Sequence, residues 1–240
     1  MKFIFIFVFS IFLSGSSNIP VDQQYLNECV ILLHGFGDIK LSMNFLEKEC
    51  QKSGYTTYNL GYSTAGETIS SLSDKLLTDL IDDCIQKGFS KIHFVTHSLG
   101  GLIVRFYLQS NSLPKGSRIV MLSPPNKGTE VADFLKSNVL YQLFAGDVGQ
   151  ELCTDSEIIR NLKELNIEIG IIAGNKSFNP FFSEIIPGED DGRISIENTK
   201  LDNMADFLIV NGSHLTIKHR REVSEQMLYF LRNGKFQQDE

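Results

Sequence analysis

Residues 91–106, Lys-Ile-His-Phe-Val-Thr-His-Ser-Leu-Gly-Gly-Leu-Ile-Val-Arg-Phe, decide how this chain folds. The apolar run 92–95 has the character of a buried strand, and an apolar pattern with helical spacing begins at Leu102. Between them lies the turn 96–101, which is centred on Ser98. A strand, a tight turn around a serine and a helix together indicate a nucleophile elbow, in which the hydroxyl stands clear of both elements.

Such a sharp turn requires small residues two positions before and two positions after the serine. Gly100 and Gly101 meet this demand, whereas Thr96 stands where glycine is usual. The match to G-x-S-x-G is therefore partial, although threonine is short enough for the position. A serine between small residues also occurs in ordinary turns, but the flanking strand and helix favour Ser98 as a nucleophile.

Strand-like and helix-like segments alternate along the chain. This order predicts an α/β fold with a mostly parallel central sheet, right-handed crossovers and helices on both faces, in one domain that spans 18–240. We expect strands at 29–33, 55–60, 91–95, 117–122, 167–173 and 207–210, and helices at 41–52, from 69 to 81, after the elbow and at 217–231.

Residues 130–165 interrupt the alternation and are too long for a connecting loop. Helical patterns cover Val131–Lys136, Leu140–Phe144 and Ile158–Leu165. This segment is predicted to be a helical cap or lid over the active site, or a plain crossover with one extra helix. Aromatic residues such as Phe134 and Phe144 would supply apolar walls for an acyl chain, or belong to the core.

The first predicted strand ends in His34-Gly35-Phe36-Gly37-Asp38. A serine hydrolase needs two backbone N–H donors for its oxyanion, and the loss of one costs about 10²–10³ in rate. We assign these donors to the N–H groups of Phe36 and of Leu99, the residue after the nucleophile. His34 is expected to order the loop rather than to act as a base.

A serine hydroxyl needs a histidine base in contact, and a carboxylate must orient that histidine. Ser98, Asp191 and His214 stand in the chain order Ser, acid, His that this kind of sheet requires. Of the five histidines, His214 alone lies in the small-residue loop directly after the last predicted strand, since His219 falls on the last predicted helix. Adjacent side chains of an extended segment point to opposite sides, so Asp191 rather than Asp190 should reach His214, with Asp206 as the next candidate.

These motifs resemble the α/β-hydrolase superfamily, and within it the bacterial lipase and esterase branch, including proteins similar to GPI inositol-deacylases. The resemblance runs from about residue 27 to 236. It is carried by Leu33-His34-Gly35-Phe36-Gly37, Thr96-His97-Ser98-Leu99-Gly100-Gly101, Ser123-Pro124-Pro125-Asn126-Lys127-Gly128, Asp191-Gly192-Arg193-Ile194 and Gly212-Ser213-His214.

The resemblance implies hydrolysis of a carboxylic ester, of a small molecule or a lipid, through an acyl-enzyme and without a cofactor or metal. It implies Ser98 as nucleophile, Asp191 as acid, His214 as base, and Phe36 and Leu99 as oxyanion donors. Acyl transfer to an alcohol, thioester hydrolysis and a non-catalytic binding protein of the same fold are the alternatives, since a fold does not determine its substrate.

Composition and cysteine spacing limit the partners. A net charge of −7 argues against a general binder of nucleic acid or anionic membranes, and leaves transient contact with a membrane surface and the oligomeric state open. The four cysteines, 29, 50, 84 and 153, fit no zinc pattern. Buried free thiols are slightly favoured over a disulfide, whose pairing the sequence does not assign.

The first residues predict a signal peptide at 1–17. Lys2 precedes an apolar stretch at 3–13 and the small residues of 14–17. A membrane-spanning helix needs about 20 apolar residues, so the stretch is too short for an anchor. Cleavage within 14–18 and a secreted or periplasmic location are therefore expected.

Overall fold

A single parallel sheet organises the computed structural model, which describes residues 27–238. Its strands are β1 (Glu28–Leu33), β2 (Thr56–Leu60), β3 (Lys91–His97), β4 (Arg118–Leu122), β5 (Glu168–Gly174) and β6 (Asp206–Val210). Their order is β2-β1-β3-β4-β5-β6, and every neighbouring pair is parallel. The predicted α/β fold is thus confirmed, with an entirely parallel rather than mostly parallel sheet.

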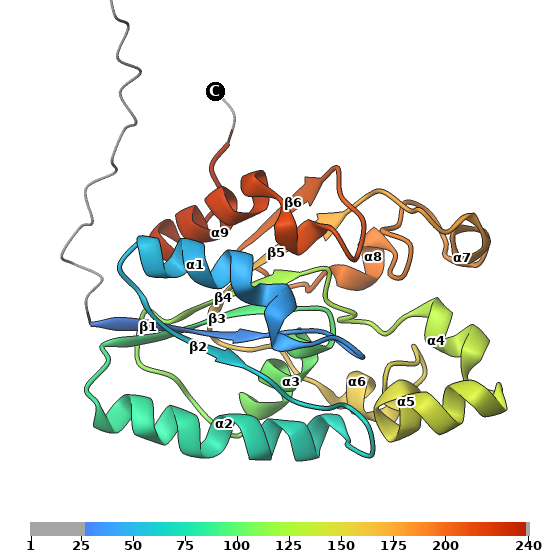
Figure 1. Ribbon diagram of the computed structural model, residues 1–240, viewed down its shortest axis with the longest axis horizontal. Coiled ribbons are helices and arrows are strands. Elements are labelled where there is room, and N and C mark those ends of the chain that lie inside the picture. Colours follow the sequence, from blue (N-terminus) through green and yellow to red (C-terminus); the bar gives the residue numbers. More distant parts are fainter. Residues whose placement is uncertain (1–26, 239–240) are drawn as a thin grey trace, which may run out of the picture.

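Helices cover both faces of the sheet, as predicted (Figure 1). One face carries α1 (Asn44–Lys52) and α9 (Arg221–Asn233), and the other carries α2 (Ile69–Gln86) and α3 (Leu99–Tyr107). Alternate residues of β1 point to opposite faces, so Leu32 packs on the α1 and α9 side and Ile31 on the α2 and α3 side. A strand buried on both sides reads as a continuous apolar run, which is why 29–33 was recognisable.

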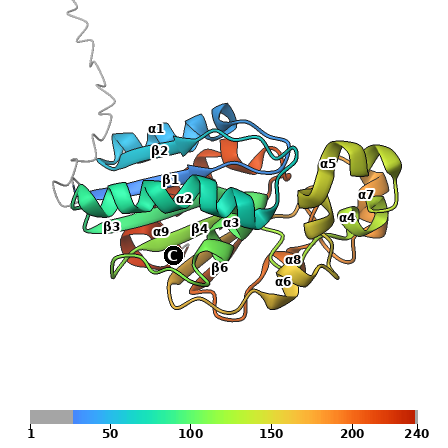
Figure 2. The ribbon, with the colours of Figure 1, turned by 90° about the horizontal axis from the view of Figure 1, so that it is seen from below.

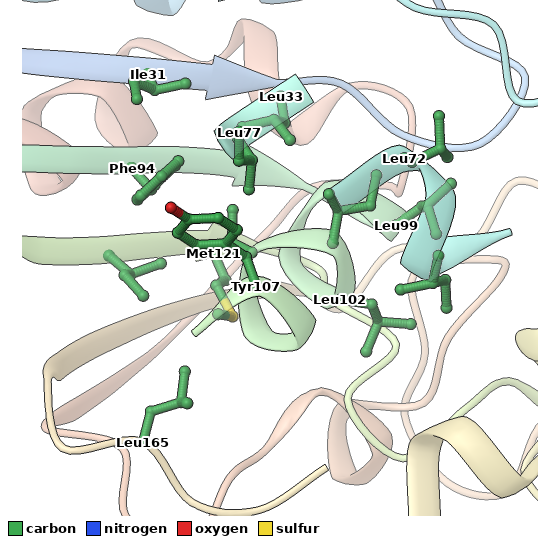
Figure 3. Close-up of a cluster of buried hydrophobic side chains, with 14 of the residues drawn as sticks. Ile31, Leu33, Leu72, Leu77, Phe94, Leu99, Leu102, Tyr107, Met121 and Leu165 are labelled. Atoms are coloured by element: carbon green, nitrogen blue, oxygen red, sulfur yellow. The ribbon is translucent and has the colours of Figure 1, made fainter. Parts of the chain in front are cut away.

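The core on the α2 and α3 side consists of side chains from three layers (Figure 3). Phe94 and Met121 project from the sheet, and Leu77 and Tyr107 meet them from the helices. Every residue of α3 from Leu99 to Arg105 is buried. This packing holds the turn before the helix in place.

A lobe of short helices extends beyond the carboxyl ends of the strands (Figures 1 and 2). It contains α4 (Glu130–Leu135), α5 (Val139–Glu151) and α7 (Pro180–Ile185), while α6 (Glu157–Asn161) and α8 (Ile196–Thr199) lie closer to the sheet. The expected small helical cap is therefore present. Its role as a lid stays a prediction.

The helix α7 of the lobe lies in a segment for which the sequence predicted a loop. Asn179 caps it by accepting the N–H of Phe182 at 3.3 Å, and Pro180 occupies its first turn. These two signals in the sequence mark a helix start. The ring of Phe181 also packs against Phe134 of α4, with 5.5 Å between centroids, which joins α7 to the rest of the lobe.

All four cysteines are buried free thiols. The sulfur atoms of Cys29 and Cys84 lie 3.8 Å apart. The predicted signal peptide, 1–17, lies outside the described residues. No helix within 27–238 has the length and apolar character needed to cross a bilayer.

Candidate active site

Ser98 occupies a strained turn between β3 and α3. Its φ of 52° and ψ of −123° fall where a residue with a side chain is rarely found. Its N–H donates to the carbonyl of Leu122 at 2.9 Å, so the neighbouring strand β4 also holds the turn. This is the backbone geometry of a nucleophile elbow.

Close packing explains the small residues around Ser98. A Cβ atom on Gly100 would lie 2.8 Å from the carbonyl oxygen of Leu33, closer than real contacts allow. A Cβ atom on Gly35 would lie 3.0 Å from the Cβ of Ser98. The loop after β1 and the elbow after β3 are therefore in direct contact, as neighbouring parallel strands permit. Thr96 is fully buried and is accommodated where glycine is usual.

Asp191 and His214 form a buried pair at the ends of β5 and β6. His214 Nδ1 lies 2.8 Å from Asp191 Oδ2, and the two residues are 5% and 2% exposed. The other carboxylate oxygen of Asp191 accepts the N–H groups of Arg193 and Ile194, each at 3.0 Å. The carboxylate is thus held by bonds on both oxygens and aimed at one ring nitrogen.

These contacts determine the charge of Asp191. Burial raises the pKa of this carboxyl, but the attraction and hydrogen bond of His214, together with Ser123 and the N–H of Ile194, lower it more. The net pKa lies below its ordinary value, and Asp191 is ionised at neutral pH. An ionised carboxylate on Nδ1 leaves Nε2 of His214 as the nitrogen able to accept a proton.

Neither alternative carboxylate reaches His214 in the structure. Asp190 accepts the hydroxyl of Ser183 at 3.0 Å and the N–H of Gly192 at 2.6 Å. Asp206 accepts the N–H of Phe236 at 2.8 Å, and it begins β6 at the opposite end from the site.

His97 connects the elbow to His214. Its Nε2 donates to the backbone carbonyl of His214 at 2.8 Å, and the two rings lie 4.8 Å apart between centroids. Burial lowers the pKa of His97 well below its ordinary value, and the nearby His214 and Lys218 lower it further. Within the described residues no hydrogen bond joins Ser98 Oγ to His214. Catalytic hydrogen bonds often tighten only when a substrate is bound.

The predicted oxyanion donors face the same region. Leu99 is the first residue of α3, and the first N–H groups of a helix have no acceptor within that helix. Among residues 27–238 no acceptor pairs with the N–H of Phe36 either. Both groups are thus free to donate, and their role in catalysis stays a prediction.

His34 orders the loop between β1 and α1. Its ring stacks on Tyr62 at 4.0 Å, Nδ1 donates to the carbonyl of Gly35 at 2.9 Å, and Nε2 faces the N–H of Tyr62 at 3.5 Å. Burial lowers the pKa of His34. Both ring nitrogens are therefore occupied in a neutral ring, which matches the structural role predicted for it.

Lys218 is a residue whose role the sequence did not reveal. The stretch Lys218-His219-Arg220-Arg221 reads as a solvated basic patch, but Lys218 is only 3% exposed and forms an ion pair with Asp38. Asp38 lies in the loop after β1 and also accepts the hydroxyl of Ser42 at 2.8 Å. The pair ties the loop after β1 to the segment that carries His214.

A cavity of about 170 Å³ adjoins the Asp191–His214 pair. Apolar side chains line its outer part, namely Phe178, Phe182 and Leu215. Asp191 and His214 thus lie in a recess that also contains three apolar side chains.

The sheet order and the helices on both faces are those of the α/β-hydrolase fold. In a comparison with known families, residues 26–126 match the family described as "Putative serine esterase (DUF676)". That match covers less than half of the chain. It includes the loop after β1 and Ser98 but ends before Asp191 and His214.

Solved structures share the fold at low sequence identity. The mature lipase BlEst2 of Bacillus licheniformis superposes with a TM-score of 0.68 at 16% identity, covering 86% of this chain and 91% of the lipase. Phospholipase PlaB of Legionella pneumophila superposes with a TM-score of 0.59 at 21% identity, covering 72% of this chain and 45% of the phospholipase.

One curated relative matches over part of the chain. The zebrafish (Danio rerio) protein SERAC1 is 32% identical over 130 residues, which is 50% of this chain. The chain spans only 19% of the length of that relative.

Proposed function

We propose that this protein hydrolyses carboxylic esters through an acyl-enzyme on Ser98, with His214 as base and Asp191 as the acid that orients it. The observation that carries the proposal is the buried 2.8 Å contact between His214 Nδ1 and Asp191 Oδ2, linked through His97 to the strained turn of Ser98. A buried carboxylate–imidazole pair has this orientation in serine hydrolases.

The mechanism follows from which atoms of Ser98 and His214 can give and accept a proton. Ser98 Oγ attacks the ester carbonyl while Nε2 of His214 takes its proton, and Asp191 stabilises the imidazolium that forms. The N–H groups of Phe36 and Leu99 donate to the oxyanion. His214 then protonates the leaving alcohol, and a water activated by the same nitrogen releases the acid.

Acyl lipids are the substrate class that we propose. The lobe exposes large apolar side chains, namely Val139, Leu140, Leu143 and Phe144 on α5, Phe134 on α4 and Phe181 on α7, and two more exposed ones, Phe178 and Leu215, line the cavity beside His214. We call these residues the apolar face. Two uncharged runs, 137–146 and 177–183, carry six of them.

An uncharged apolar face favours contact with a neutral lipid surface over an anionic one. Such contact would be transient, and it would bring the cavity beside His214 to the acyl chains. Thioester hydrolysis and acyl transfer use the same residues, and product analysis distinguishes them.

A fluorophosphonate label tests the proposal. The label should modify one serine, and peptide mapping should place it on Ser98. Purified protein should then release p-nitrophenol from p-nitrophenyl butyrate, and the label should abolish that release. An unlabelled protein without ester hydrolysis would instead be a non-catalytic binding protein of this fold.

We also propose export. The charged, apolar and small-residue pattern of 1–17 supports it. Mass spectrometry of the exported protein should find a new amino terminus between Ser14 and Ile19. Intact Met1 on a membrane-bound protein would contradict cleavage.

A further inference from the structure

A second cavity, of about 290 Å³, lies apart from the candidate active site. Its walls come from α3, from the turn after β4, from α6 with the residues that follow it, and from the segment after α8. The cavity shares no lining residue with the one beside His214.

The lining of this cavity is cationic although the protein is acidic. Five basic residues contribute to it, Arg105, Lys127, Arg160, Lys163 and Lys200, against two acidic ones, Glu164 and Asp202. Lys200 forms an ion pair with Glu197, so within the described part of the chain four basic residues of the lining remain without such a pair to a residue outside it. The whole chain carries a net charge of −7. The cavity is thus a local concentration of positive charge, and a concave cationic site attracts anions.

Arg105 is the deepest of these groups, only 4% exposed. Its Nη1 donates to the backbone and side-chain oxygens of Asn126 at 3.0 and 3.1 Å, and its Nη2 lies 3.5 Å from the carbonyl of Leu162. Its Nε has no hydrogen-bond partner. Burial lowers the pKa of Arg105 to about 10.

The charge of Arg105 has no counter-ion among residues 27–238, because all of its partners are neutral oxygens. A structural role, joining α3 to the loops after β4 and α6, explains those hydrogen bonds. It does not explain the charge, since an isolated buried charge costs several kcal/mol and is usually paired. An uncharged hydrogen-bond donor at this position would serve a purely structural role at a lower free-energy cost of desolvation.

We propose that this cavity binds a small anionic ligand bearing a phosphate or carboxylate group, with Arg105 as the buried contact and Lys127 and Lys163 as contacts at its mouth. Neither lysine side chain forms an ion pair or hydrogen bond with another of the residues described. Both are exposed and line the cavity.

The chemistry of the lining favours an oxyanion. A guanidinium donates in a planar fork that matches carboxylate and phosphate, and lysine ammonium groups add compact charges. A volume of about 290 Å³ is at the lower end of the range for small-molecule pockets. The ligand is therefore small, and its binding stabilises the folded protein by mass action.

Calorimetric titration of the full-length protein at low salt tests the site, with inorganic pyrophosphate and citrate as separate probes. We expect saturable binding of at least one probe with a Kd below about 1 mM, and a higher melting temperature at saturation. Tighter binding of pyrophosphate would identify a phosphate ligand, and tighter binding of citrate a carboxylate ligand.

Two matched double variants locate the binding. K127Q/K163Q should weaken it at least about tenfold, since each lysine loses a charge-assisted contact. K48Q/K115Q removes the same charge from exposed positions outside the cavity and should leave the Kd unchanged. Hydrolysis of a short-chain ester at the parent rate by both variants shows that they are folded.

Arg105→Met tests the buried contact and should abolish binding. If that variant fails to fold, the two lysine variants still decide the question. The proposal is overturned if neither probe binds the parent protein below about 10 mM, or if the two lysine variants weaken binding equally, which would indicate non-specific attraction.

Discussion

The strand ends that carry Ser98, Asp191 and His214 and the lobe of α4, α5 and α7 adjoin each other but are built differently. The three side chains are 7%, 2% and 5% exposed, whereas Leu143 and Phe144 of the lobe are 74% and 77% exposed. Hydrogen bonds and close backbone contacts hold the strand ends. The lobe presents apolar surface that has few partners within the chain.

This contrast follows from what each part has to do. Proton transfer requires atoms held within a few tenths of an ångström, and buried hydrogen bonds supply that order. Contact with an apolar substrate or surface is non-directional and scales with area, so it needs exposed side chains rather than fixed geometry. Substitutions in the two parts should therefore change different measurable quantities.

The largest effect is expected at the nucleophile. Ser98→Ala should lower kcat for a soluble ester by about 10⁶-fold, as in related triads, and leave only the catalysis provided by the oxyanion donors. The melting temperature should not fall, because the change removes one hydroxyl from a strained position. Activity within a few-fold of the parent would rule out Ser98.

The second largest loss of activity is expected at Asp191, and the adjacent Asp190 provides a matched control. Asp191→Asn should lower kcat by about 10⁴-fold at neutral pH, because an amide favours the wrong tautomer of His214. Asp190→Asn should stay within about tenfold, since among residues 27–238 its carboxylate accepts hydrogen bonds from Ser183 and Gly192 and not from His214. If Asp190→Asn lost activity and Asp191→Asn kept it, Asp190 would be the acid.

Changes in the lobe should separate lipid contact from chemistry. L143S/F144S removes two exposed apolar side chains and should lower the rate on an emulsified long-chain ester by about tenfold or more, from the transfer free energy of such groups. Hydrolysis of dissolved p-nitrophenyl butyrate should change less than about twofold. Equal losses on both substrates would show that the lobe acts on the site itself.

The smallest effect is a pH dependence of stability in the buried part. The lowered pKa of His97 means that the unfolded chain binds its proton at a higher pH than the folded protein does. Stability is therefore complete above the ordinary histidine pKa of about 6.5 and decreases as the pH falls below it. The melting temperature should fall between pH 7 and pH 5.

His97→Gln is the variant that checks the origin of this pH dependence. Glutamine retains a donor for the carbonyl of His214 but does not titrate, so the fall in melting temperature should become shallower. An unchanged slope would assign it to other buried histidines. One of these is His93, whose pKa burial lowers although Glu28 opposes the shift.

Much of this molecule could be predicted from local patterns. Residues 29–33 and 92–95 read as strands because both of their faces are buried, which leaves a continuous apolar run. Gly100 marked the elbow because a Cβ atom there would collide with Leu33. Asp191 could be preferred over Asp190 because adjacent side chains diverge, and the structure places Asp191 on His214. In each case the physical cause acts over a few residues.

Other features depended on residues far apart in the chain. Lys218 looks like part of a surface patch, yet Asp38, 180 positions away, pairs with it because the loops after β1 and β6 both lie at the carboxyl ends of the parallel strands. Arg105 looks like one more residue of an apolar helix, and only the convergence of three later loops surrounds it with cationic residues. The sequence by itself determined the strands, the helices that cover the sheet and the candidate triad, because short-range sterics and burial periodicity leave local marks. The tertiary structure decided where the unpaired charges and the apolar face lie, because these depend on which loops the sheet order brings together.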